Sequence, residues 1–415
     1  MCEPVATDWD SCTRYLGRAL CRYNGLTNSA KLELISDVVA GEAIDKEGVK
    51  LGDLFEEKPF CYAYEIIKQF ENIKGGVNPR SAEVHMQHAI SFKFLLRTFH
   101  GGKSHRRKLS SKLESTTHIA LAPLGRAYRS IAVLPDQEGK KFGSFIWEYA
   151  LLDRDFDMYG LLIKLAEENS GELVDIDVFY DRFYDIKHRQ VDWLKEKFPY
   201  ATRRTDIQRN MQCIGRRVGE GKRGRKRVFE LDTVFQFSDK TKNDHYSQRK
   251  RWAEKFGHAS KSRITKHGID LAQCLPSTDS FPFFWLGPPL LTARARTLSA
   301  AAIDEKQCSP AWNILLPAAE TVKDEVDSEL VDVVAEYMEK SFDIVRLRNF
   351  AQASLDVVVP YVHFVEREFL LSGKIHQRVN LRTLFREAFR KHRDKFVCTL
   401  HGNLSKSHYW LRKQQ

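Results

Sequence analysis

The residues with the clearest chemistry are a dense run of arginines and lysines near the middle of the chain. Ten bases fall between residues 203 and 227, and only Asp206 and Glu220 oppose them. Because the whole chain has a formal net charge of +11, this window supplies most of the excess. Such bases bind phosphates and release counterions, which drives nucleic-acid binding; the alternative is a solvated basic loop without a partner. The bases are Arg203, Arg204, Arg209, Arg216, Arg217, Lys222, Arg223, Arg225, Lys226 and Arg227.

Two shorter basic clusters extend this nucleic-acid-binding set. One follows a Gly-Gly pair near residue 101, and the other lies in YSQRKRWAEKFGH at 246–258. The second stretch has helical spacing, which predicts Trp252 and Phe256 inside and the bases outside. The clusters are Arg106 with Arg107, and Arg249 with Lys250 and Arg251.

The familiar motifs of catalysis and metal binding are missing from the sequence. It has no phosphate-binding loop, no GxGxxG after a strand, no HExxH and no GxSxG. We therefore predict no catalytic residues, no metal and no cofactor. One alternative stays open, a divergent metal-dependent nuclease that uses Asp177, Asp185 and Lys187. These three residues lie in a segment with helical spacing, where carboxylates usually face solvent.

Apolar periodicity predicts a mainly α-helical chain with short β-strands. The segment from Phe142 to Asn169 predicts two helices that meet near residues 153–157, and the segment 172–199 predicts two further short helices. An acidic helical region at 320–343 carries an apolar stripe, which we interpret as a surface for a partner or a second copy; the alternative is an acidic face that only repels DNA. The eight cysteines are scattered, as is typical of reduced thiols in the cytoplasm.

Two stretches share one layout, HIALAPLGRAYRSI at 118–131 and SRITKHGIDLAQCL at 262–275. Each has a short β-prone piece, then Ala or Thr, two residues, a glycine and an amphipathic helix. This resembles the end of a winged-helix unit, in which the glycine would relax the backbone at the corner. The pair resembles the tandem winged-helix recognition region of type IIS restriction endonucleases, over roughly residues 60–300. The PD-(D/E)xK nuclease pattern of those enzymes is absent here.

The resemblance implies how DNA would be held. Helices between about residues 174 and 197, an arginine-rich wing and the helix at 247–256 would grip the duplex. The expected fold is α+β, mainly α with short β wings, with tandem winged-helix units and a helical C-terminal region. The predicted ranges are a helical lead-in at 1–58, a first unit at 59–135, a second unit with the basic wing at 136–303, and a helical C-terminal domain at 312–415.

The expected function is DNA binding by a non-catalytic recognition subunit of a multi-protein prokaryotic system, such as restriction or phage defence. The expected partners are double-stranded DNA and other protein subunits, an ATPase or a nuclease; RNA stays open. The nuclease above is one alternative, and a kleisin-like winged-helix adaptor of an ATPase complex is another. No stretch approaches the roughly 18 apolar residues of a membrane span, so we expect a cytoplasmic protein without a membrane partner.

Overall fold

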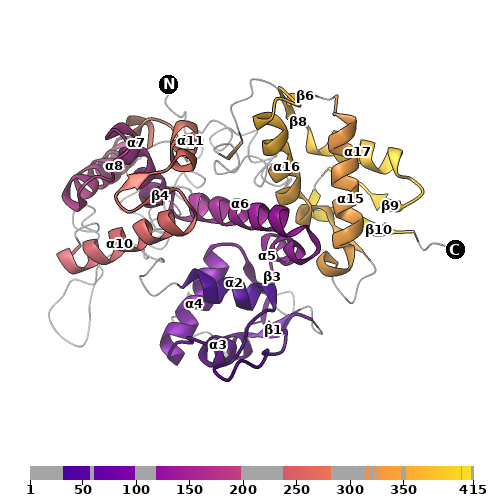
Figure 1. Ribbon diagram of the computed structural model, residues 1–415, viewed down its shortest axis with the longest axis horizontal. Helices are drawn as coiled ribbons and strands as arrows, with labels where there is room; N and C mark the ends of the chain where they lie inside the picture. Colours follow the sequence, from indigo (N-terminus) through magenta and orange to yellow (C-terminus); the bar gives the residue numbers. More distant parts are fainter. Residues whose placement is uncertain are drawn as a thin grey trace. The chain divides into compact units, whose positions relative to one another are not determined.

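The computed structural model divides the chain into two compact units, which are described separately (Figure 1). Unit 1 comprises residues 1–28 and 151–315, and unit 2 comprises residues 29–150 and 316–415. The boundary therefore falls inside helix α6 (Asp136–Asp155). The residues that the structure describes are 31–56, 60–98, 118–197, 237–281, 315–316, 322–323, 325–346, 352–402 and 404–412.

Unit 2 begins with a helix, a strand, two helices and a two-stranded hairpin, in that order. The last strand lies in the middle of an antiparallel sheet of order β1-β3-β2. A short helix follows it. We call this arrangement repeat A. Its elements are α2 (Leu32–Ala40), β1 (Cys61–Tyr62), α3 (Ala63–Asn72), α4 (Pro79–Ser91), β2 (Leu95–Thr98), β3 (His118–Leu121) and α5 (Pro123–Arg129).

Unit 1 contains the same order of elements, which we call repeat B. Strand β5 pairs with β4 on one side and with the single bridge residue Glu172 on the other. The strand that comes last in sequence is therefore again central. The elements are α7 (Leu161–Glu168), the bridge at Glu172, α8 (Ile176–Lys197), α10 (Asp239–Lys255), β4 (Ala259–Ser260), β5 (Arg263–Ile264) and α11 (Lys266–Cys274).

The C-terminal region of unit 2 forms a third such arrangement, repeat C. Its sheet has the order β7-β10-β9, again antiparallel with the last strand in the centre. The region expected as a helical C-terminal domain at 312–415 contains three α-helices among its described residues, and it also closes on this small sheet, which we did not predict. Its elements are α15 (Ser328–Val345), β7 (Ala353–Ser354), α16 (Val359–Leu371), α17 (Leu381–Lys391), β9 (Phe396–Thr399) and β10 (His408–Leu411).

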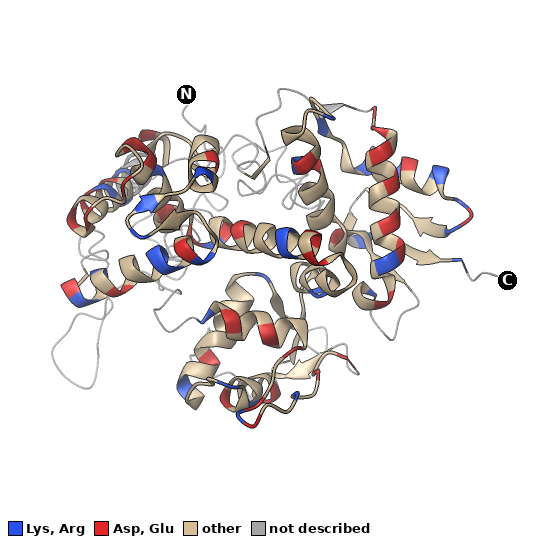
Figure 2. Ribbon diagram, in the orientation of Figure 1, with Lys and Arg blue, Asp and Glu red and all other residues tan. Residues whose placement is uncertain are grey.

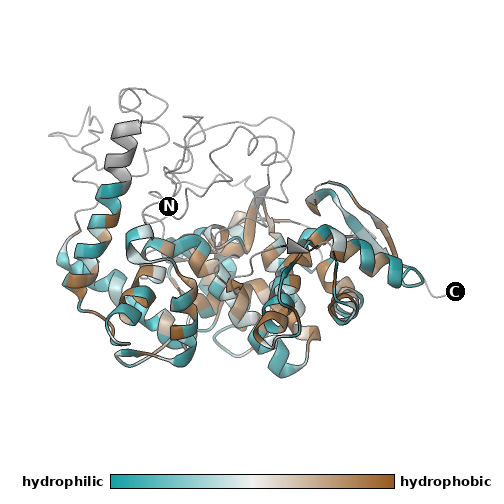
Figure 3. Cartoon of the chain, turned by 90° about the horizontal axis from the view of Figure 1, so that it is seen from above, coloured by the Kyte–Doolittle hydropathy of each residue, from teal (hydrophilic) through white to brown (hydrophobic). Residues whose placement is uncertain are grey.

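The predicted mainly helical fold with short strands is confirmed, and its three-stranded sheets are antiparallel. Helices carry one hydrophobic and one hydrophilic side, as Figure 3 shows, and the hydrophobic sides are buried because burial removes apolar area from water. The assignment of winged-helix units stays a prediction. Elements outside the repeats include the parallel pair β6 (Val322–Lys323) and β8 (Arg378–Val379), and the short turns η2 (Ser130–Val133) and η8 (Leu355–Val357).

Two of the predicted helix boundaries can be compared directly with the structure. The expected junction near residues 153–157 is confirmed, because α6 ends at Asp155 and a π-helical turn, η3 (Phe156–Gly160), leads into α7. The two short helices expected at 172–199 are instead one, α8. Phe179, Phe183 and Ile186 are buried along one side of it, so a single apolar stripe runs through the segment.

Within unit 2, repeats A and C pack together through α5 and η2 against α15 and α16. The ring of Tyr337 stacks on that of Tyr361 with centroids 3.8 Å apart, and its hydroxyl lies 2.7 Å from Ser130 Oγ. Val334 and Met338 are fully buried on the same helix. The apolar stripe of the acidic region is therefore covered by the chain itself, so our interpretation of it as a partner surface is wrong.

The acidic side of α15 is matched by bases of its own unit (Figure 2). Lys391 Nζ lies 2.7 Å from Asp332, and Lys395 Nζ lies 2.7 Å from Glu339. His392 Nε2 also lies 2.9 Å from Asp332, and together the bases lower the pKa of that carboxyl, chiefly through the Lys391 hydrogen bond. These contacts join the C-terminal end of α17 to α15.

The shared layout found in the sequence marks the same corner in repeats A and B. In repeat A the amide of Ala122 donates to Phe94 O (2.9 Å), and in repeat B that of Thr265 donates to His258 O (2.9 Å). A Cβ on Gly125 would lie 2.1 Å from Phe94 O, and one on Gly268 would lie 2.1 Å from His258 O. Neither glycine has a positive φ. The glycine is required for close approach, and the expected backbone relaxation is wrong.

Candidate nucleic-acid interface

Most of the bases predicted to bind nucleic acid lie outside the described residues. This applies to the ten bases at 203–227, and to Arg106 and Arg107. Their place in the chain is still informative. The run at 203–227 falls between α8 and α10, the second and third helices of repeat B. The two strands of the repeat B hairpin, β4 and β5, are joined only by Lys261 and Ser262. The run is therefore not the wing of that hairpin; only Arg106 and Arg107 fall between two paired strands, β2 and β3.

Arg249 is placed in the interior of unit 1, and this corrects its assignment as a phosphate-binding residue. Its side chain is fully buried, and its Nε and Nη2 atoms donate to Asp155 at 2.7 and 2.8 Å. The guanidinium also lies 5.4 Å from the Trp252 ring. A base paired through two hydrogen bonds inside the core cannot reach a phosphate without breaking them. On the same helix Lys250 is half-buried and Arg251 is exposed, so these two stay predicted binding residues.

The carboxylate that holds Arg249 belongs to a buried polar centre at the junction of α6 and η3. Asp157 forms an ion pair with the buried Lys187 of α8, and the Tyr159 hydroxyl lies 2.7 Å from Nδ1 of His258. Asp155 thus connects the segment from the end of α6 through η3 to α10, and Asp157 connects it to α8. Tyr159 connects it to His258, which lies just after α10. This centre fixes the two long helices of repeat B relative to η3.

The carboxylates of the alternative nuclease do not converge. Asp177, Asp185 and Lys187 all lie on α8, and Asp177 is about 15 Å along the helix from Lys187 at 1.5 Å per residue. Asp185 is half-buried and lies 3.7 Å from Arg182 of the same helix, whereas Lys187 is fully buried on the other side. A metal-dependent nuclease needs carboxylates that converge on a bound ion. Helix α8 does not bring these carboxylates together.

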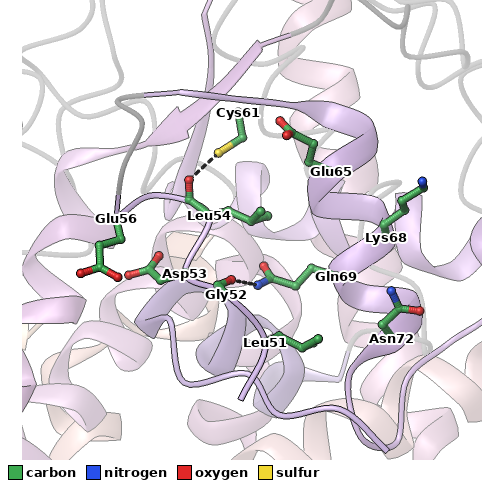
Figure 4. Close-up of a pocket in the computed structure, with 10 residues that line it drawn as sticks. All are labelled: Leu51, Gly52, Asp53, Leu54, Glu56, Cys61, Glu65, Lys68, Gln69 and Asn72. Atoms are coloured by element: carbon green, nitrogen blue, oxygen red, sulfur yellow. Dashed lines mark hydrogen bonds between the residues drawn. The ribbon is translucent and has the colours of Figure 1, made fainter. Parts of the chain in front are cut away.

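A pocket of about 420 Å³ opens in repeat A between the loop 51–56 and helix α3 (Figure 4). Two of its polar side chains are engaged by backbone carbonyls of the loop: Gln69 Nε2 donates to Gly52 O at 2.7 Å, and the Cys61 thiol donates to Leu54 O at 2.9 Å. Asp53 is paired with Arg129 through a 3.1 Å contact and a second, shorter one. No histidine, serine or threonine is among its ten lining residues, so they supply no nucleophile with a neighbouring histidine base.

The third helices of the three repeats differ in charge. On α4 the exposed side offers Arg80 beside the half-buried Glu83 and Gln87, and α10 exposes Lys240, Arg251 and Lys255. Helix α17 exposes Arg382, Arg386 and Arg390, spaced four residues apart. We did not predict these three as binding residues. The four-residue spacing in LRTLFREAFRK could have revealed them, because residues i, i+4 and i+8 share one helix face.

Comparison with protein-family models, with curated proteins and with solved structures finds no match for this chain. No helix among the described residues is both long and apolar enough to cross a membrane.

Histidine burial in repeat B predicts a pH dependence of stability. Desolvation, helped by the charge of Arg249, lowers the pKa of His245 from 6.5 to about 4. Between these two pH values the unfolded chain binds more protons than the folded one, so stability falls as pH decreases from about 6.5 to about 4. Urea denaturation at several pH values should show a shallower acid loss in His245→Gln than in wild type. Parallel curves for the two proteins would contradict this.

Proposed function

We propose that the chain binds double-stranded DNA without catalysing a reaction, through three winged-helix units that correspond to repeats A, B and C. The order of elements supports the proposal most strongly. A helix, a strand, two helices and a hairpin, with the last strand central, is the order of elements in a winged helix. In helix-turn-helix proteins of this kind a recognition helix enters the major groove. The third helices α4, α10 and α17 would take that position.

Charge supports a polyanion as the partner. The net charge of +11 and the ten bases at 203–227 form the electrostatic pattern expected of a nucleic-acid-binding protein. Their position between the second and third helices of repeat B would place them beside its recognition helix in the chain. That the protein serves as a subunit of a restriction or phage-defence system stays a prediction from the resemblance.

The test is a salt titration of binding to labelled duplex DNA, single-stranded DNA and duplex RNA, followed by fluorescence anisotropy. We expect a steep loss of duplex-DNA affinity with salt in the wild type. Combining Arg223→Ala, Arg225→Ala and Arg227→Ala should reduce the log–log slope by up to about 2.7, because each phosphate contact contributes about 0.9.

A control with the same loss of charge separates contact from net charge. Lys46, Lys74 and Lys140 are exposed lysines of unit 2, and their combined change to alanine should leave the slope nearly unchanged. Absence of salt-sensitive binding by the wild type to any of the three nucleic acids would overturn the proposal and favour a protein-binding adaptor. A preference for duplex RNA would replace DNA as the partner.

A further inference from the structure

Helix α17 presents a stripe of exposed arginines made of Arg382, Arg386 and Arg390, which we call the α17 stripe. At 100° per residue the three side chains lie within about 80° of one another, and they extend over about 12 Å of the helix. Leu384 and Phe385 are fully buried on the side that faces the unit. The helix is therefore divided lengthwise into an apolar inner side and a basic outer side.

Among the described residues, the neighbouring bases form ion pairs with another helix of the unit, and the arginines of the α17 stripe do not. Lys391, His392 and Lys395 are held by acids of α15, as described above. Within the described part of the chain, Arg382 and Arg386 form no ion pair, and Arg390 contacts only Glu387 of its own helix, at 2.5 Å. Exposed pairs of this kind contribute less than about 1 kcal/mol, so a stronger anionic partner can replace Glu387.

The helix that carries the stripe is rigidly attached at both ends. The Asn380 side chain caps its N-terminus, accepting hydrogen bonds from the amides of Arg382 (3.0 Å) and Thr383 (3.2 Å). Its C-terminal end is joined to α15 through Lys391 and Asp332. A ligand that binds the stripe would therefore meet a pre-organised surface, which lowers the entropy cost of binding.

Among the three equivalent helices, only α17 presents three arginines on a single exposed side. The exposed side of α4 has one base, Arg80, with Glu83 three residues on, whereas α10 exposes one arginine, Arg251, and two lysines, Lys240 and Lys255. If the exposed bases of these helices served only solubility, the arginines would not need to be concentrated on one side of one helix. Charge therefore separates α17 from α4 within unit 2.

We propose that α17 lies in the major groove of duplex DNA, with Arg382 and Arg386 on backbone phosphates and Arg390 at the groove edge. This inference rests on the proposed function and assigns it a second contact, separate from residues 203–227. The major groove is about 12 Å wide and admits an α-helix. Successive arginines about 6 Å apart along the helix suit the charge spacing of a phosphate backbone better than an isolated anion.

The test uses the full chain with Arg382→Gln and Arg386→Gln combined, in the same duplex-DNA salt titration. We expect the log–log slope to decrease by up to about 1.8, with a roughly tenfold or greater loss of affinity at low salt. The matched control is Lys46→Gln with Lys140→Gln, which removes the same charge from exposed positions of unit 2 outside the three proposed recognition helices and should keep the wild-type slope. Circular dichroism melting should show both variants folded, because all four side chains are exposed.

The outcomes distinguish the inference from the proposed function. If the wild type binds duplex DNA and the α17 variant keeps the wild-type slope, the inference is overturned and the proposed function stands. If the wild type itself shows no salt-sensitive binding, the proposed function fails first. If the α17 variant keeps its DNA slope but loses binding to phosphatidylserine vesicles, the stripe serves a membrane surface and the inference is wrong.

Discussion

Replacing Arg249 with alanine is expected to lower the free energy of unfolding of unit 1 by about 3–5 kcal/mol. The reason is the charge that remains. Asp155 is 4% exposed and accepts two hydrogen bonds from the guanidinium, at 2.7 and 2.8 Å. Without its partner, the carboxylate must stay charged in the interior or take up a proton, and either change destabilises the folded state.

Hydrogen exchange of peptides from α10 would measure the effect within unit 1, and urea denaturation would measure it for the whole chain. Arg251→Ala is the matched control, because this arginine is exposed two residues away on the same helix; its cost should stay within about 0.5 kcal/mol. Arg249→Ala and Asp155→Ala combined should cost less than the sum of the two changes, since they share one ion pair.

The same variant tests the sequence-based role of Arg249. If Arg249 bound a phosphate, its loss would reduce the DNA-binding salt slope by about one. We expect instead an unchanged slope in the fraction of protein that remains folded, and faster exchange in α10. A variant as stable as wild type with a reduced slope would show that the ion pair with Asp155 is broken in the DNA-bound state.

Replacing Gly268 with alanine is expected to cost about 3 kcal/mol or more, at the upper end of the range for overpacking. The added Cβ would lie 2.1 Å from the carbonyl oxygen of His258 and 3.0 Å from its carbon. Both are backbone atoms, so relief requires the start of α11 to move away from the turn that follows α10. The hydrogen bond from Thr265 N to His258 O, 2.9 Å long, would be disturbed by that movement.

Gly125→Ala is the counterpart in repeat A and should behave in the same way, because its Cβ meets Phe94 O at 2.1 Å. Gly402→Ala is the control, since it has no atom within 4 Å of the added carbon and no positive φ. Thermal melting of the three variants would rank them. If Gly268→Ala has the same melting temperature as Gly402→Ala, the corner of repeat B is looser than its contacts indicate.

Local pattern was sufficient where the determining contacts are local. Helical spacing predicted the junction of α6 and α7, because apolar residues on either side of Asp155 each need a buried face. The shared Ala/Thr-x-x-Gly layout located equivalent corners in repeats A and B. The sheet of repeat C was missed because β9 and β10 are four residues each and only Phe396 and Tyr409 are buried on them, too few to show alternation.

The sequence by itself determined a mainly helical chain with short strands, its excess of positive charge and the position of its two matched corners. Only the tertiary structure decided which bases are free for a ligand. Arg249 is occupied by Asp155, 94 positions away, whereas Arg382 and Arg386 lie on the outer side of α17. Burial and ion pairing depend on which distant segments meet, and a one-dimensional pattern carries no record of such meetings between residues far apart in the chain.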